Sequence, residues 1–291
     1  YSLTGWFIGM QNTRTPMYVS IAQNITNLLV SITLVFGFGL RIEGVALGTM
    51  IAQWTGFGMA LMWLKRSLAK VKDRDSDKPG MKWYHGMLRF FAVNRDIFLR
   101  TLCLISVMLF FTSAGSRQGE TVLAVNALLM QFYMMFSYIM DGFAYAGEAI
   151  SGRRYGAGNH KALRETVSAL FRWGAGMTIG FTLAYALGGE AFISLLTSDR
   201  SVILASHEYM FWAVLMPMAG VAAFVWDGVF IGCTMTGGML RSMFGATIAF
   251  FGVYFVARSS MGNHGLWLAF TLYMAMRGAI QTKYGEEEDD L

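Results

Sequence analysis

Long apolar runs that are almost free of charge constrain this chain more than any other feature of its sequence. Of its 291 residues, 55% are hydrophobic and only 14% are charged, whereas soluble domains carry about 25% charged residues. Water would expose too much apolar surface on such a chain, but a lipid bilayer tolerates an apolar exterior. The composition therefore predicts an all-α, polytopic transmembrane helix bundle.

Eight apolar runs reach the length of about 20 residues that a helix needs to cross a bilayer. Residues 1–10 have the composition of the last turns of one further helix. The predicted spans are residues 17–38, 44–64, 97–114, 121–150, 167–187, 209–232, 239–257 and 265–280.

One long polar stretch, residues 65–96, separates the second predicted span from the third. Its second half is either an amphipathic helix at the membrane surface or part of a solvated linker with one short helix. If this stretch is cytoplasmic, most of the 23 basic residues, Arg277 among them, fall on the same side of the membrane. Because basic residues accumulate on the cytoplasmic side, we expect a multi-pass protein of the plasma (inner) membrane. Its acidic tail, residues 282–291, is then cytoplasmic.

A sequence repeat predicts a protein of two similar lobes. GWFIG at residues 5–9, with a threonine four residues later, recurs as GVFIG at residues 228–232. GVAL at residues 44–47 is echoed by GLWL at residues 265–268, again roughly 220 residues further on. Many transporters consist of two related halves.

On this basis residues 1–64 are expected to end the first lobe. Residues 65–96 are the inter-lobe linker, and residues 97–281 form a second lobe of six helices. The same repeat predicts that roughly 140 residues of the first lobe precede this chain.

The sequence contains no known motif for metal binding, nucleotide binding or nucleophilic catalysis. Cys103 and Cys233 stand apart in apolar runs, and the four histidines lack the spacing of metal ligands. No glycine-rich phosphate loop or nucleophile motif is present. We therefore expect no enzyme, no resident cofactor or metal and no nucleic-acid partner, with transport driven by an ion gradient or a partner subunit.

Acidic residues inside the predicted spans are the candidates for function, because charge inside a bilayer is costly. On the span 121–150 they belong to one stripe that must face protein or a water-filled cavity. We interpret it as lining a translocation cavity in which the acids exchange protons or hold a cation. Alternatively, the acids pair with bases such as Arg100, Arg153 or Arg154. The stripe consists of Asn126, Met130, Met134, Ser137, Asp141 and Glu148.

Asp227 is a lone acid in a glycine-rich helix and a candidate titrating group, with Arg100 as its charge partner. Alternatively, Asp227 makes a helix-packing hydrogen bond, and Arg100 reaches to lipid phosphates. A second polar stripe lies on the span 17–38 and also needs a protein interior. It contains Ser20, Asn24, Asn27 and Ser31.

Three segments resemble the multidrug and toxic compound extrusion (MATE) family, and within it a DinF-like subgroup. They are MDGFAYAGEAISGRRYGAGN at residues 140–159, WDGVFIGCT at residues 226–234 with MLRSM at residues 239–243, and GMQNTRTPM at residues 9–17. The last segment has Asn12 where the family usually has Asp. Asp227 matches a helix position at which many relatives have a coupling acid.

The resemblance implies a two-lobed, twelve-helix antiporter that works by alternating access. Such proteins export small amphipathic, often cationic compounds in exchange for H⁺ or Na⁺. In the first lobe, Asn27 and Thr49 match polar pocket positions, whereas Ser31 stands where many relatives have an acid. We expect a transporter that works as a monomer in contact with membrane lipid.

The main alternative function is a flippase for lipid-linked oligosaccharide precursors, which would need a cationic central cavity. A membrane-embedded enzyme or a scaffold is a third possibility. An enzyme would need a nucleophile–base pair or a metal constellation, and neither is visible in the sequence.

Overall fold

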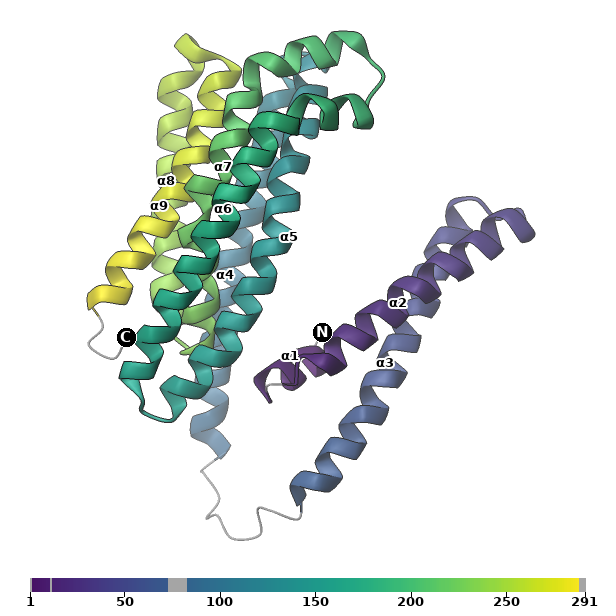
Figure 1. The fold of residues 1–291 in the computed structure, drawn as a ribbon, viewed down its shortest axis with the longest axis vertical. Coiled ribbons are helices and arrows are strands. Elements are labelled where there is room, and N and C mark those ends of the chain that lie inside the picture. Colours follow the sequence, from purple (N-terminus) through teal and green to yellow (C-terminus); the bar gives the residue numbers. More distant parts are fainter. Residues whose placement is uncertain (1, 11, 73–82, 288–291) are drawn as a thin grey trace. The chain divides into compact units, whose positions relative to one another are not determined.

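The computed structural model describes residues 2–10, 12–72 and 83–287, and throughout these ranges the secondary structure is helical (Figure 1). This confirms the predicted fold class. In chain order the elements are α1 (Ser2–Gly9), α2 (Arg14–Ile32), a π-helical turn η1 (Thr33–Gly37), α3 (Ile42–Lys72), α4 (Trp83–Ser116), α5 (Glu120–Gly156), α6 (His160–Leu196), α7 (Arg200–Gly232), α8 (Thr236–Met261) and α9 (Asn263–Glu287).

Seven of the eight predicted spans each lie inside one helix. The first, residues 17–38, runs through α2 and η1 and ends one residue beyond η1. Seven of the described helices, α2 to α8 with η1 extending α2, are long and apolar enough to cross a membrane. The eighth predicted span, residues 265–280, lies in α9, which is not among the seven. Polar residues lower its mean hydropathy. Leu266, Trp267 and Phe270 are fully buried, whereas Leu272 and Met276 are exposed. The chain is an integral membrane protein.

The chain divides into two units, residues 1–83 and residues 84–291. In the first unit α2 packs along α3, and α1 touches both. Gly48 lets α2 approach α3, because a Cβ at that position would lie 2.2 Å from Ser31 Oγ.

The predicted linker begins and ends as helix. α3 continues to Lys72, and α4 begins at Trp83, so the first and last parts of residues 65–96 prolong the neighbouring helices. Residues 73–82 of the linker and residues 288–291 of the predicted tail lie outside the described residues.

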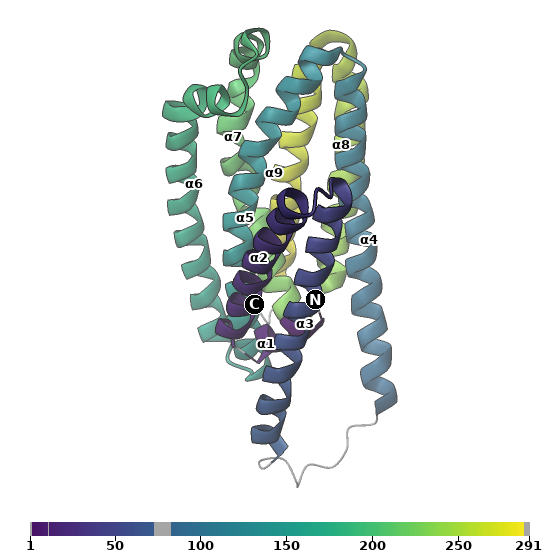
Figure 2. The same cartoon turned by 90° about the vertical axis from the view of Figure 1, so that its right-hand side faces the viewer.

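In the second unit α7 is the central helix, because it packs against α5, α6 and α9, and α8 packs along α9. Figure 2 shows α6 and α4 on opposite sides of this unit. α7 begins at an N-cap in which Asp199 accepts hydrogen bonds from the Ser201 amide and hydroxyl. These bonds lower the pKa of the exposed Asp199 carboxyl.

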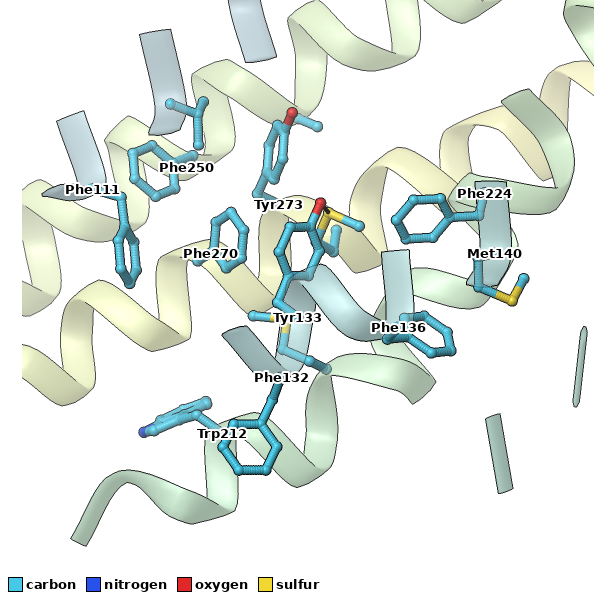
Figure 3. Close-up of a cluster of buried hydrophobic side chains, with 14 of the residues drawn as sticks. Phe111, Phe132, Tyr133, Phe136, Met140, Trp212, Phe224, Phe250, Phe270 and Tyr273 are labelled. Carbon is cyan, nitrogen blue, oxygen red and sulfur yellow. Dashed lines mark hydrogen bonds between the residues drawn. The ribbon is translucent and has the colours of Figure 1, made fainter. Parts of the chain in front are cut away.

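Aromatic side chains fill the core of the second unit (Figure 3). Phe111 of α4 meets Trp267 of α9 edge-on at a ring-centroid distance of 5.0 Å and lies at a tilt to Phe270 of α9 at 5.2 Å. Tyr133 of α5 meets Phe270 edge-on at 5.3 Å. These ring contacts bring α4, α5 and α9 together, and each edge-on pair contributes about 0.5–1.5 kcal/mol beyond its buried area.

Glycines bring the backbones of α5 and α7 into direct contact. A Cβ on Gly228 would lie 2.2 Å from the Ala144 carbonyl oxygen, and one on Gly232 would lie 2.4 Å from the Glu148 carbonyl oxygen. Only hydrogen at these Cα atoms allows such an approach. The close contact includes the last two turns of α7 and therefore the position of Asp227.

The sequence repeat has a structural counterpart. Each copy of the five-residue motif ends a helix, at Gly9 of α1 and at Gly232 of α7, and the next helix begins shortly after it. The second pair of similar segments, residues 44–47 and 265–268, lies near the beginnings of α3 and α9. The order α1, α2, α3 therefore matches the order α7, α8, α9.

Candidate functional site

Asp227 is the central residue of a buried charged cluster in the second unit. It lies on the half of α7 that packs closely against α5, and it is 6% exposed. A carboxylate at such a position requires compensation, because an isolated charge inside a membrane is costly.

Three side chains from two other helices supply this compensation. Arg100 of α4 and Arg277 of α9 each donate a hydrogen bond from Nη2 to Oδ2 of Asp227. Gln281, one helical turn after Arg277, donates from Nε2 to Oδ1 at 2.7 Å. The structure thus brings Arg100 and Asp227 together and adds two partners from α9.

The two arginines differ in their surroundings. The Arg277 side chain is 3% exposed, and its guanidinium carbon lies 5.9 Å from the centre of the Phe224 ring. The Arg100 side chain is 17% exposed. The Nε atoms of both arginines and Oε1 of Gln281 are buried without a hydrogen-bond partner in the described part of the chain.

Asp141 of α5 lies near this cluster without joining it. It is half-buried and interacts electrostatically with Asp227, Arg100 and Arg277. It makes no hydrogen bond or ion pair with the residues that the structure describes. Counted together, two arginines and two aspartates balance in charge when both acids are ionised.

Glu148 stands apart from the cluster. It is half-buried on α5 and forms no ion pair or side-chain hydrogen bond within residues 83–287. Arg154, one of its predicted alternative partners, instead donates a hydrogen bond to the Ala162 carbonyl oxygen. Glu148 therefore remains a candidate for binding a proton or a cation.

The other members of the α5 stripe have different surroundings. Met130 and Met134 are half-buried and pack against the aromatic core, and Ser137 is half-buried. Asn126 is 3% exposed and exchanges two hydrogen bonds of 2.9 Å with Asn263 of α9. Its Oδ1 also accepts from Trp267 Nε1 at 2.8 Å. In this structure Asn126 joins α5 to α9.

In the first unit, the three predicted polar residues lie together. Asn27 of α2 donates to Thr49 Oγ1 of α3 at 3.1 Å. Ser31 donates to Asn27 Oδ1 at 3.4 Å. Asn27 and Ser31 are half-buried and Thr49 is exposed within this unit, so the three form a small polar site between α2 and α3.

Sequence reasoning missed Arg277 and Gln281. Arg277 was counted among the cytoplasmic basic residues, but it is 2% exposed inside the helix bundle. Its position within the predicted span 265–280 was the available signal, since an ionisable residue inside a span indicates a polar partner. Gln281 follows four residues later on the same helix face.

A family comparison identifies the class of protein to which this site belongs. Residues 97–256 match the MatE family, a stretch that covers the cluster's residues on α4, α5 and α7. The chain belongs to the MatE family.

Two curated relatives extend the similarity to nearly the whole chain. It is 36% identical over 276 residues to DNA damage-inducible protein F of Escherichia coli (strain K12), covering 95% of this chain and 60% of that protein. It is 29% identical over 282 residues to Protein DETOXIFICATION 42 of Arabidopsis thaliana, covering 95% of this chain and 52% of the relative. The chain thus spans between half and two thirds of the length of these proteins.

Solved structures show the same fold. The crystal structure of the eukaryotic MATE transporter AtDTX14 matches with a TM-score of 0.87 at 16% identity, over 99% of this chain and 65% of that one. The Vibrio cholerae MATE transporter VcmN in its bent form matches with a TM-score of 0.82 at 17% identity, over 98% and 64%.

Proposed function

We propose that this chain belongs to an ion-coupled antiporter that exports small amphipathic, often cationic compounds by alternating access. H⁺ or Na⁺ is the coupling ion, and no other cofactor takes part. Asp227, Asp141 and Glu148 are the coupling acids, and Arg100 is the charge partner.

The charged cluster around Asp227 is the observation that supports this proposal most strongly. Two acids and two arginines lie together inside a bundle of membrane-spanning helices of the MatE family. Arg277 is almost fully buried, so these charges are not the exposed pairs of a protein surface. Buried acids in transporters mark ion pathways and proton relays.

The proposal includes an arrangement in the membrane. Residues 1–64 belong to the first lobe, residues 97–281 form the second, and the protein works as a monomer in the inner membrane with a cytoplasmic C-terminus. Asn27, Ser31 and Thr49 line the cavity in the first lobe. Met130, Met134, Ser137 and Asn126 belong to the corresponding region of the second.

A flippase for lipid-linked precursors is less well supported. Such a protein needs free positive charge for a pyrophosphate headgroup, but Arg100 and Arg277 both donate to Asp227.

Ethidium transport in everted membrane vesicles tests the proposed function. We expect added ethidium to release H⁺ or Na⁺ from vesicles that contain the protein. Asp227→Asn and Asp141→Asn should each abolish this release, because either change removes one of the two negative charges from the cluster. A pH-sensitive dye and a sodium-sensitive dye report the two ions separately.

Glu190→Gln is the matched control, since Glu190 is an exposed acid that pairs with His207 at 3.5 Å, away from the cluster. It should release ions like the unmodified protein. Normal ion release in both aspartate variants would remove these acids from the coupling mechanism. Ethidium movement without any ion release would contradict the antiporter itself.

A further inference from the structure

Asp227 keeps its charge compensation even without Arg100. Arg277 and Gln281 both lie on α9, one helical turn apart, and each binds a different oxygen of the Asp227 carboxylate. The Arg277 side chain is almost fully buried and lies beside the Phe224 ring. One helix therefore holds this acid firmly.

Arg100 is held much less firmly. Asp227 is its only hydrogen-bond partner in the part of the chain that the structure describes. Its side chain is more exposed than that of Arg277, and its buried Nε has no partner. Arg100 also comes from a different helix, α4, which a 3.2 Å hydrogen bond from Thr236 to Asp96 links to α8.

Asp141 is the acid without a fixed partner. It lies one helical turn before Ala144, whose backbone touches Gly228 beside Asp227. Its charge interacts with those of Arg100, Asp227 and Arg277, but it makes no hydrogen bond to them in the described part of the chain. An unpaired carboxylate is costly inside a membrane, so Asp141 has two low-energy states. It is either protonated, or ionised and paired with a cation.

We propose that Arg100 exchanges between Asp227 and Asp141, and that Asp141 is the acid that gains and loses the coupling proton. The arrangement in the structure is the form in which Asp141 carries the proton. When the carboxyl group releases the proton to water, Arg100 keeps its charge and moves its hydrogen bond to the new carboxylate. Asp227 then remains paired with Arg277.

This inference rests on the proposed function and assigns unequal roles to its two aspartates. Tyr133 of α5 and Tyr273 of α9 are the other titratable groups that interact with these charges. Because the exchanging arginine lies on α4 and its two acceptors lie on α7 and α5, the protonation state selects which helix α4 is tied to. The contact that Arg100 makes therefore differs between the protonated and the ionised state of Asp141. Coupling requires such a difference between two conformations.

Infrared difference spectroscopy of the purified protein in liposomes tests the exchange without any transported compound. The C=O stretch of a protonated carboxyl group is distinct from that of a carboxylate, so its loss with rising pH reports one titrating acid. We expect a band that Asp141→Asn removes and that Glu120→Gln, a change of an exposed acid on the same helix, leaves in place.

The arginine variants test the change of partner. Arg100→Gln should move the midpoint of the Asp141 band to higher pH by about one unit or more, because a nearby opposite charge favours the ionised form of an acid. Arg100→Lys should largely restore the original midpoint. Asp227→Asn should move it to lower pH, since Arg100 is then free to stay with Asp141.

A band that survives in Asp141→Asn, or a midpoint that Arg100→Gln leaves unchanged, would overturn the exchange. The ethidium assay separates this failure from that of the proposed function. Ion release together with an unchanged midpoint rejects only the exchange. The expected infrared shifts without ion release reject only the antiporter.

Discussion

Asn126 shows how one buried amide can join helices that are far apart in the sequence. It lies on α5 and bonds to Asn263 and Trp267, which follow it by more than 130 residues. Gly115 of α4 leaves room for it, because a Cβ there would lie 2.8 Å from Asn126 Nδ2. Three helices thus meet at a single residue.

Asn126→Ala should lower the free energy of unfolding by about 1–3 kcal/mol, because it leaves buried polar groups of Asn263 and Trp267 unpaired. Thermal unfolding in detergent measures the effect. Asn94→Ala is the control, because Asn94 is exposed and bonds only within its own helix, to the Phe90 carbonyl oxygen. It should change the stability by less than about 0.5 kcal/mol. Equal effects of the two changes would contradict the assigned role.

At the scale of residues, the sequence alone identified Asp227 but not the residues of α9 that bind it. A lone acid in an apolar helix identifies Asp227, because the cost of burying charge can be judged from one position. Its partners Arg277 and Gln281 lie about 50 residues further along the chain. Pairing at that distance depends on how α7 and α9 pack, which no local pattern encodes.

At the scale of helices, the close contact of α5 and α7 determines where Asp227 and Asp141 lie relative to each other. Gly228, next to Asp227, touches the backbone of Ala144, which is three residues after Asp141. The glycines of α7 allow this close packing. Because backbone meets backbone, this contact has no flexible side chain that could yield to an added atom.

Gly228→Ala should therefore destabilise the protein by about 1–3 kcal/mol or more, since the added methyl group would lie 2.2 Å from the Ala144 carbonyl oxygen. It should also weaken ethidium-driven ion release by displacing Asp227. Thermal unfolding and the vesicle assay measure these two effects.

Gly176→Ala on α6 is the control for this substitution. Nothing lies within 4 Å of its Cβ position, and alanine favours a helix over glycine by about 1 kcal/mol. It should leave stability unchanged or slightly raised. If Gly228→Ala behaved in the same way, α5 and α7 would not be in backbone contact at this position.

At the scale of the whole molecule, the order of the helices was predictable because the length of an apolar run can be read from one stretch of sequence. Seven of the eight predicted spans each fall within one helix, the first runs through α2 and η1, and most helices extend beyond the predicted ends. The ends were less predictable because α3, α4, α5 and α6 continue into sequence that is polar enough to lie outside the hydrocarbon. The identity of the neighbouring helices had to come from the structure.

The distribution of basic residues predicts an orientation with a cytoplasmic C-terminus, and this prediction is open to a direct test. A single cysteine at Ser198, between α6 and α7, should react with a membrane-impermeant maleimide on intact cells. One at Ala157, between α5 and α6, should react only after permeabilisation. Each cysteine is introduced into a variant in which both native cysteines are replaced, Cys103→Ser and Cys233→Ser. The reverse labelling pattern would place the C-terminus outside.

The polar character of α9 has a consequence for how the protein is made. On an insertion scale an arginine at the centre of a helix costs about 2.5–3.5 kcal/mol, and α9 carries Arg277 within an otherwise apolar run. Its neighbours α7 and α8 precede it in the chain and leave the ribosome first. The carboxylate of Asp227 is thus already in place when Arg277 emerges. Entry of the last helix into the bilayer therefore depends on a counter-charge supplied by helices synthesised before it.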